Sequence, residues 1–277
     1  MKKFTLASLL VFAAASANEP TSIRDLWYFA PKGVFGGIST PSYLHSDYNN
    51  GASSSKQDVF TLRQTLNYSL FNNFSLFVDE AYITGYYQHN GDISGLTNPG
   101  LGLQHQAIIN QEDNLYYRGI LRVSPTLGRR KSNNQLSGYT SIAYNALIGQ
   151  VLGNLEYHFG VAATYYTETS ESVPPNIKPR YDIGFTLDGQ YDINQNWAAG
   201  LSLGMTLPGT IQASDGSYQT KTAYVYTVEL GPSYLVSDKL SIALHGSYSN
   251  STGESKVGAL RLRNSYGALS TIKYNFN

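Results

Sequence analysis

One histidine and one serine are placed where they could react together. His245 and Ser247 are separated by a single residue. On a β-strand both side chains would lie on the same face, because side chains alternate between the two faces. There the imidazole could accept the hydroxyl proton and activate the oxygen as a nucleophile. This pair is the strongest catalytic candidate in the sequence.

Other catalytic and metal-binding patterns do not occur in the sequence. The chain has no cysteine, and its five histidines do not form close pairs, so the ligand spacing of a zinc site is not met. Neither a phosphate-binding glycine loop nor a Gly-x-Ser-x-Gly turn is present. We therefore predict no catalytic residue, no cofactor and no bound metal ion.

A larger group of ionisable residues falls on the polar side of an alternating pattern. If the pattern forms a barrel, these side chains line its lumen, where they could select a solute by charge. Alternatively, they pair with one another across the barrel and fill it, and we favour a narrow or plugged lumen. The lumen-lining candidates are Arg63, Arg118, Arg122, Glu156, His158, Arg180, Asp182, Asp188, Lys221, Glu229, His245, Arg261 and Arg263.

The alternation that positions these residues has a period of two. In residues 181–193, aromatic and aliphatic side chains occupy most odd positions, while the even positions are polar, charged or glycine. The same alternation occurs in residues 60–70, 155–163, 197–207 and 224–234. A period of two indicates β-strands rather than helices.

Residues 260–276 form the most informative of these strands. One face is apolar and ends with Tyr274 and Phe276, and the other is polar and includes Arg261 and Arg263. Soluble strands are usually about 5–6 residues long, so this one is unusually long. An apolar, aromatic-rimmed face opposite a charged face suits a strand between lipid and a watery lumen. The segment resembles the closing strand of bacterial outer-membrane barrels, which typically ends on an aromatic residue.

The connections between the expected strands alternate between two kinds. We expect short polar turns at Asn72-Asn73, 110–114, Gly153-Asn154, 194–196 and 237–239. We expect longer loops rich in Ser, Asn, Gly and Pro at about 45–56, 89–98, 128–136, 169–179, 212–217 and 250–256. These eleven connections predict about twelve strands, with ten or fourteen left open. The predicted fold is all-β, an antiparallel up-and-down transmembrane β-barrel.

Residues 1–17 have the features of a secretory signal peptide. A basic start at Met1-Lys2-Lys3 and an apolar run precede Ala15-Ser16-Ala17, which matches an A-x-A cleavage site. The rival interpretation is a membrane anchor, but a spanning helix needs about 20 apolar residues. We predict export, cleavage near Ala17 and location in the outer membrane of a Gram-negative bacterium.

Residues 18–32 precede the barrel, which we expect to span residues 33–277. Ile23, Leu26, Trp27 and Phe29 could form a short amphipathic helix that begins at Thr21 or Ser22. This segment would remain in the periplasm or enter the lumen as a plug. A plain tether with interfacial aromatic residues is an equally open alternative.

Asp79 and Glu80 are adjacent, so a regular strand would turn one of them toward lipid. One hypothesis is a β-bulge that turns both side chains inward, and bulges often lie near functional sites. Unbroken alternation of the two residues at mid-height of the barrel would exclude this hypothesis.

Residues 95–103 carry a family resemblance. Their sequence, Gly-Leu-Thr-Asn-Pro-Gly-Leu-Gly-Leu, resembles the Gly…Asp/Asn-Pro-x-Leu-Gly strand of the MetA-pathway phenol-degradation-like outer-membrane proteins. The rhythm of strands and turns is similar over most of residues 33–277. The resemblance implies a barrel that passes small organic, often aromatic, molecules, and no binding residue carries over from it.

The alternation also decides between candidate functions. Tyr248 would face lipid, which places His245 and Ser247 in the lumen. Some outer-membrane lipid hydrolases resemble this chain in having a His-x-Ser pair, but theirs faces the bilayer. We therefore predict that the chain is not an enzyme. We predict a narrow channel or transporter for a small solute, with hydrophobic and aromatic molecules among the candidates.

Two other functions and several partners belong to the same prediction. The main alternative is a structural or surface-adhesive barrel that acts through its extracellular loops, and a lipid-modifying enzyme is less favoured. We expect contacts with outer-membrane lipids, with the barrel-assembly machinery through the C-terminal strand, and with an unknown small solute. The formal net charge is zero, which gives no reason to expect a nucleic-acid partner.

Overall fold

The computed structural model describes residues 22–49, 54–87, 91–127, 140–167, 180–208, 224–252 and 261–276. The predicted signal peptide lies outside these ranges. Within them the chain forms β-strands and turns. No helix in the described ranges is long and apolar enough to cross a membrane.

The described residues form thirteen β-strands, and each paired neighbour is antiparallel. The strands are β1 (Phe35–Asn49), β2 (Ser54–Phe71), β3 (Phe74–Tyr87), β4 (Gly91–Leu96), β5 (Gly100–Asn110), β6 (Leu115–Ser124), β7 (Thr140–Leu152), β8 (Leu155–Thr167), β9 (Arg180–Asp192), β10 (Trp197–Pro208), β11 (Tyr224–Ser237), β12 (Leu240–Thr252) and β13 (Arg261–Asn275).

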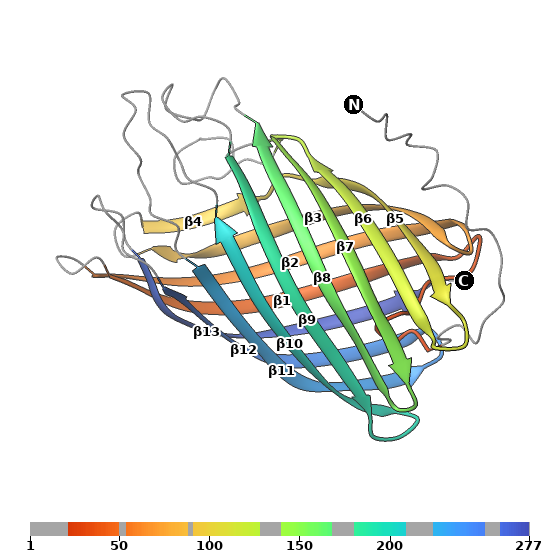
Figure 1. Cartoon of the computed structure of the whole chain (residues 1–277). Helices are drawn as coiled ribbons and strands as arrows, with labels where there is room; N and C mark the ends of the chain where they lie inside the picture. Colours follow the sequence, from red (N-terminus) through yellow and green to blue (C-terminus); the bar gives the residue numbers. More distant parts are fainter. Residues whose placement is uncertain are drawn as a thin grey trace, which may run out of the picture.

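The strands close into a barrel rather than an open sheet (Figure 1). β1 is hydrogen-bonded to β2 on one side and to β13 on the other, and β2 continues to β3. β4 and β5 both pair with β3, one after the other along its length, and so occupy one position in the wall. The thirteen strands therefore fill twelve strand positions around the barrel wall. The predicted fold class and strand number are confirmed.

The seam between the first and last strands is the pairing that a closing strand at residues 260–276 requires. Ser46 of β1 and Ser265 of β13 are both buried, and their hydroxyl oxygens lie 2.8 Å apart. At the other end of the seam, the N–H of Phe276 donates to the carbonyl of Phe35 at 2.8 Å. The two phenyl rings stack with their centroids 5.0 Å apart. Polar contacts thus lie on the inner face of the seam and aromatic contacts on its outer face.

Side chains alternate between an apolar outward face and a polar inward face. Leu187, Leu203 and Leu230 are exposed on the outside of neighbouring strands. On the inside, Ser75 and Gln190 are buried. Apolar residues outside and polar residues inside suit a wall between lipid and a polar interior.

Five short connections gather at one end of the barrel (Figure 1). They join β2 to β3, β5 to β6, β7 to β8, β9 to β10 and β11 to β12, at the positions predicted from the sequence. We call this the turn end and the opposite end the loop end. Of the predicted long loops, 128–136, 169–179 and 212–217 lie outside the described residues. The loops predicted at about 45–56 and 250–256 are wrong for residues 45–49, 54–56 and 250–252, which belong to β1, β2 and β12.

The loop predicted over residues 89–98 is wrong for Gly91–Leu96, which form β4. Glycine and serine there are typical of loops, but pairing with the loop end of β3 overrides this local preference. Between β4 and β5, Thr97–Pro99 lie opposite only two residues of β3, which makes them a β-bulge. Pro99 has no N–H to donate to a ladder, so a bulge suits it.

The predicted β-bulge at Asp79 and Glu80 is wrong. The β2–β3 register runs through both residues without a shift. Asp79 is buried on the inward face and Glu80 is exposed on the outward face. The bulge of this region lies on the facing strand instead, at Thr97–Pro99.

A disulfide can test the seam register, because the chain has no native cysteine. We expect the double variant Ser46→Cys, Ser265→Cys to form an intramolecular disulfide on mild oxidation. The two residues are direct partners across β1 and β13, which suits disulfide geometry. Thiol labelling and electrophoresis without reductant will report the bond. In the control Ser46→Cys, Ser75→Cys, both cysteines face inward on unpaired strands and should stay reduced; equal oxidation of both variants would contradict the register.

Candidate functional site

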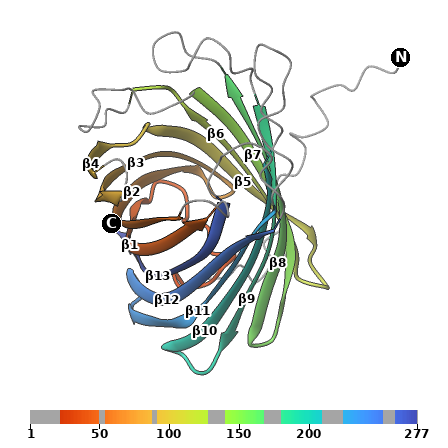
Figure 2. The same cartoon turned by 90° about the vertical axis from the view of Figure 1, so that its left-hand side faces the viewer.

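Residues 22–34 lie inside the ring of strands near its turn end (Figure 2), and we call them the N-terminal segment. Ser22 and Asp25 close a turn in which Asp25 N–H donates to the Ser22 carbonyl at 2.9 Å. Ser22 N–H in turn donates to Asp25 Oδ2 at 3.0 Å. The segment forms turns here, and the predicted short helix is not present in the described residues.

Trp27 anchors the segment to the wall. Its side chain is 1% exposed and packs with Tyr116 and Leu147. The indole stacks on Tyr116 at a centroid distance of 5.4 Å and meets the His158 ring edge-on at 5.7 Å. Its Nε1–H donates to the carbonyl of Tyr157 at 3.2 Å. The large indole is buried and its N–H has a hydrogen-bond partner. Trp27 therefore makes the main apolar contribution to docking of the segment.

Inward side chains of β5, β6 and β8 bind the backbone around Trp27. Glu156 Oε2 accepts from Leu26 N–H at 2.8 Å and from Trp27 N–H at 3.4 Å. Arg118 donates to the carbonyls of Leu26 at 3.2 Å and Tyr28 at 3.0 Å. These hydrogen bonds involve charged side chains, and such bonds are stronger than hydrogen bonds between neutral groups.

Gln106 completes this set of backbone contacts. Its Nε2 donates to the carbonyl of Trp27 at 3.0 Å, while its Oε1 accepts two bonds from Arg118, at 2.6 and 3.0 Å. The Arg118 guanidinium also lies over the rings of Trp27, at 5.5 Å, and Phe29, at 5.8 Å. Three wall side chains thus supply the partners that an irregular backbone does not find within itself.

Arg24 ties the segment to the end of β9, the neighbour of β8, and to the turn that follows β9. Its side chain is 4% exposed, and its Nη2 lies 2.8 Å from Asp192 Oδ1. Its Nη1 donates to the carbonyls of Asn194 and Gln195 in the β9–β10 turn, at 3.3 and 3.4 Å. Lys273 of β13 donates to the Arg24 carbonyl at 3.5 Å. The segment is therefore held from several sides of the barrel.

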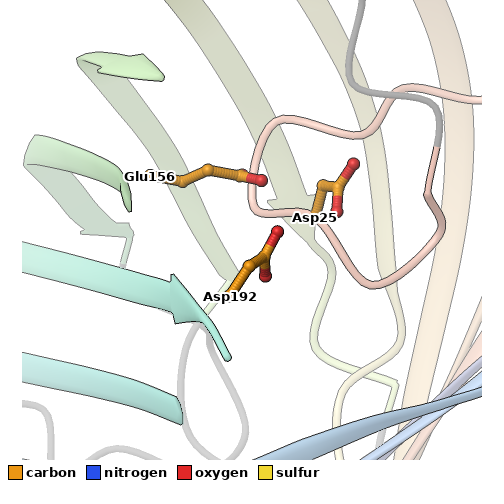
Figure 3. Close-up of side chains that lie close together, drawn as sticks. All are labelled: Asp25, Glu156 and Asp192. Carbon is orange, nitrogen blue, oxygen red and sulfur yellow. The ribbon is translucent and has the colours of Figure 1, made fainter. Parts of the chain in front are cut away.

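Three carboxylates meet beside this anchor: Asp25 of the segment, and Glu156 and Asp192 of the wall (Figure 3). One oxygen from each lies within 4.8 Å of the others. A hard cation accepts such ligands, but each carboxylate already has a protein donor. Asp25 accepts from Ser22, Glu156 from Leu26 and Trp27, and Asp192 from Arg24. The geometry fits an ion network that docks the segment.

Burial raises the pKa of Asp25 above its ordinary value. The hydrogen bond from Ser22 opposes the shift, the negative charge of Asp192 adds to it, and Arg24 and Lys273 oppose it. Desolvation penalises the charged form of a carboxyl group, and here it outweighs the nearby cations. The docked segment therefore holds the Asp25 proton more strongly than an undocked segment would.

The structure divides the predicted lumen-lining residues into those that bind the segment and those that do not. Arg118, Glu156 and His158 contact it, as described above. Arg122 instead pairs with Asp79 through two hydrogen bonds, at 2.9 and 2.6 Å. His158 also pairs with Asp188 on the neighbouring strand β9, and its Nε2 lies 2.5 Å from Asp188 Oδ2.

Arg63, Glu229 and His245 have no contact with the segment in the described part of the chain. By strand register, the inward face also holds Arg63, Asp182, Glu229 and His245. Only the backbone positions are described for Arg180, Arg261 and Arg263. Lys221 lies outside the described residues.

Sequence reasoning did not identify several residues of this site. The alternation of residues 100–110 and 261–275 would have placed Gln106 and Asn275 on the inward face. Asn275 Nδ2 donates to the Tyr28 hydroxyl at 2.7 Å. Arg24 and Asp25 lie in a segment without periodicity, so no pattern indicated their partners.

Fluorescence quenching can test docking through Arg24. The chain has two tryptophans, so Trp197→Phe leaves Trp27 as the only one, and its buried indole should resist acrylamide. Adding Arg24→Ala should increase quenching, because Asp192 and the β9–β10 turn lose their partner. Arg63→Ala, an inward arginine without contact to the segment, is the matched control. Equal quenching in all three proteins would contradict the docked arrangement.

The raised pKa of Asp25 predicts a pH dependence for docking. Docking should be strongest at low pH and weaken as pH rises from the ordinary aspartate pKa through the raised value. Asp25→Asn removes the ionisation and keeps an acceptor for Ser22. In the Trp197→Phe background, this variant should show less acrylamide quenching than its parent at pH values above the raised pKa of Asp25. Its quenching should also change less with pH. Asp113→Asn, in an exposed turn, should retain the parent profile; an unchanged profile in Asp25→Asn would refute the prediction.

Known proteins resemble this chain in structure and not in sequence. No protein-family model matches the sequence, and no curated protein is similar to it. The COG4313 outer membrane channel from Pseudomonas putida F1 matches with a TM-score of 0.72 at 16% identity, over 91% of this chain and 99% of that chain. The translocator domain of the autotransporter NalP from Neisseria meningitidis matches with a TM-score of 0.58 at 11% identity, over 89% and 90%. The NanC porin matches with a TM-score of 0.51 at 9% identity, over 84% and 98%.

These likenesses establish the fold as that of bacterial outer-membrane barrels, as the sequence predicts. The narrower resemblance to the phenol-degradation-like proteins stays a prediction. A channel, a porin and a translocator share this fold, so the inward contacts must carry the argument about function.

Proposed function

We propose that this chain is an outer-membrane channel for small solutes, with a lumen narrowed by the N-terminal segment. The observation that carries the proposal is the direction of the binding contacts. Glu156, Arg118 and Gln106 all reach inward to hold residues 26–28. A barrel that served only as a membrane anchor would not need this set of charged and polar inward contacts.

The segment restricts the turn end from several sides. Its contacts include residues of β5, β6, β8, β9 and β13. On the remaining side, Lys32 N–H donates to Asn72 Oδ1 in the β2–β3 turn at 3.0 Å. Contacts with strands around most of the barrel wall support the interpretation of the segment as a plug. Solutes would pass it only when the segment shifts or leaves the lumen.

The rest of the inward face supports passage of a polar or charged group. Arg63 is exposed there and has no partner among the described residues. Glu229 and Asp182 lie on the other wall, on β11 and β9. Opposed charges around a lumen select solutes by charge, so the inward candidates outside the plug contacts are proposed as solute-lining residues. The Pseudomonas barrel of the same fold is described as an outer membrane channel, which supports this class of function.

The alternatives find less support in the geometry. His245 and Ser247 share the inward face by register, so a lipid in the surrounding membrane would not meet them. An adhesive barrel would act through loops outside the described residues. Outward apolar side chains fit contacts with membrane lipids, and we infer that β13, with Phe276 after it, is the strand recognised by the barrel-assembly machinery.

Conductance in planar bilayers tests the proposal. Purified wild-type protein should give small or infrequent current steps, because the docked segment narrows the lumen. Trp27→Ala should give larger or more frequent steps, since truncating a buried tryptophan weakens packing by about 3–5 kcal/mol. Trp197→Ala removes an outward tryptophan and should behave as the wild type. A closed scaffold would give no steps in any variant, and steps unaffected by Trp27→Ala would separate channel activity from the segment.

A further inference from the structure

A polar row crosses the outward face of the barrel on its first three strands. Ser39 of β1 is the direct partner of Gln64 of β2, and Gln64 is the direct partner of Glu80 of β3. Gln64 and Glu80 are exposed, and Ser39 is partly exposed. We call these three residues the outward polar row.

The row lies midway between two sets of outward aromatic residues. Ser39 and Gln64 are each four residues from an outward aromatic residue in both directions along their strands, whereas Glu80 is two residues from the outward Tyr82 and six from Phe74. The flanking residues are Phe35 and Tyr43 on β1 and Phe60 and Tyr68 on β2. Glu80 lies at the same height as Gln64 because the two residues are direct partners. Aromatic residues on transmembrane strands gather at the two membrane interfaces. The outward polar row is therefore at mid-membrane height.

A carboxylate at this height needs a partner, because lipid chains offer no hydrogen-bond donor. Glu80 has no hydrogen bond or ion pair within the described part of the chain. Elsewhere on the outward face, Leu187, Leu203 and Leu244 are exposed, and Ser270, the direct partner of Leu244, is polar but uncharged. The outward polar row is thus a local departure from a lipid-facing surface.

The remaining donors and acceptors of the row are self-complementary. Gln64 Nε2 donates to Ser39 Oγ at 2.7 Å, which leaves the Ser39 hydroxyl hydrogen free to donate. Gln64 keeps one N–H and its carbonyl, and ionised Glu80 is an acceptor only. A two-fold axis through Gln64 would place Ser39 of one copy beside Glu80 of the other, and the two Gln64 amides against each other.

We propose that a second copy of this chain docks on the outward face of β1, β2 and β3, through Ser39, Gln64 and Glu80. A two-fold contact of this kind uses the same patch on both copies. Polar side chains at such a contact hydrogen-bond across it within the membrane. The proposal rests on the membrane location of the barrel and not on its channel activity. A failure of the conductance test therefore leaves it intact.

Single cysteines test the contact without interference, because the chain has none of its own. In isolated outer membranes treated with an oxidant, full-length Gln64→Cys should form a disulfide-linked dimer of twice the monomer mass. Leu203→Cys, exposed on the outward face of β10, is the matched control and should remain monomeric. Equal dimer formation by both variants, or by neither, would overturn the proposal, as would a Gln64→Cys adduct with a different protein.

Glu80→Leu separates a dimer contact from a lone lipid-facing carboxylate. In the Gln64→Cys background, this substitution should cause loss of the cross-linked dimer. Folding is checked by the heat-dependent electrophoretic mobility of the barrel. If Glu80 simply faced lipid, Glu80→Leu would raise the unfolding temperature and leave the cross-linking of Gln64→Cys unchanged, and that result would overturn the proposal.

Discussion

Every backbone donor and acceptor of a wall within a membrane needs a partner in the protein, and the pairing of β1 with β13 supplies the last row of them. Without this seam, both strands would be open edges. Closure also commits each side chain to the inside or the outside. Inward residues that are far apart in sequence, such as Arg118 and Lys273, can therefore reach one short segment.

The wall binds the N-terminal segment largely through its backbone. A segment of turns lacks the regular hydrogen-bond ladder of a strand, so its N–H and carbonyl groups need other partners in a confined interior. Glu156 accepts from N–H groups, and Arg118 and Gln106 donate to carbonyls. Some of the charged inward side chains thus bind the segment. This explains why the lumen face carries charges of both signs although not all of them face a solute.

The period of two made the strands, the seam and the short turns predictable, because each follows from local alternation and turn residues. Gly91–Leu96 were missed, since their composition is that of a loop and only pairing with β3 makes them a strand. The contacts of Arg24 and Trp27 were beyond sequence reasoning for another reason. They join a segment without periodicity to strands more than a hundred residues away, and no local rule encodes such a docking.

Asp79 and Glu80 show how strictly the alternation governs the chemistry of this wall. The two carboxylates are neighbours in sequence, and an unbroken strand sends them to opposite environments. Inside, Asp79 is neutralised by Arg122 from β6 with two hydrogen bonds. Outside, the described residues of the barrel offer Glu80 no cation, and Gln64 beside it already donates to Ser39. Because the closed ring fixes which face each residue occupies, the chain can satisfy the first acid by itself, while the second requires a donor from another molecule.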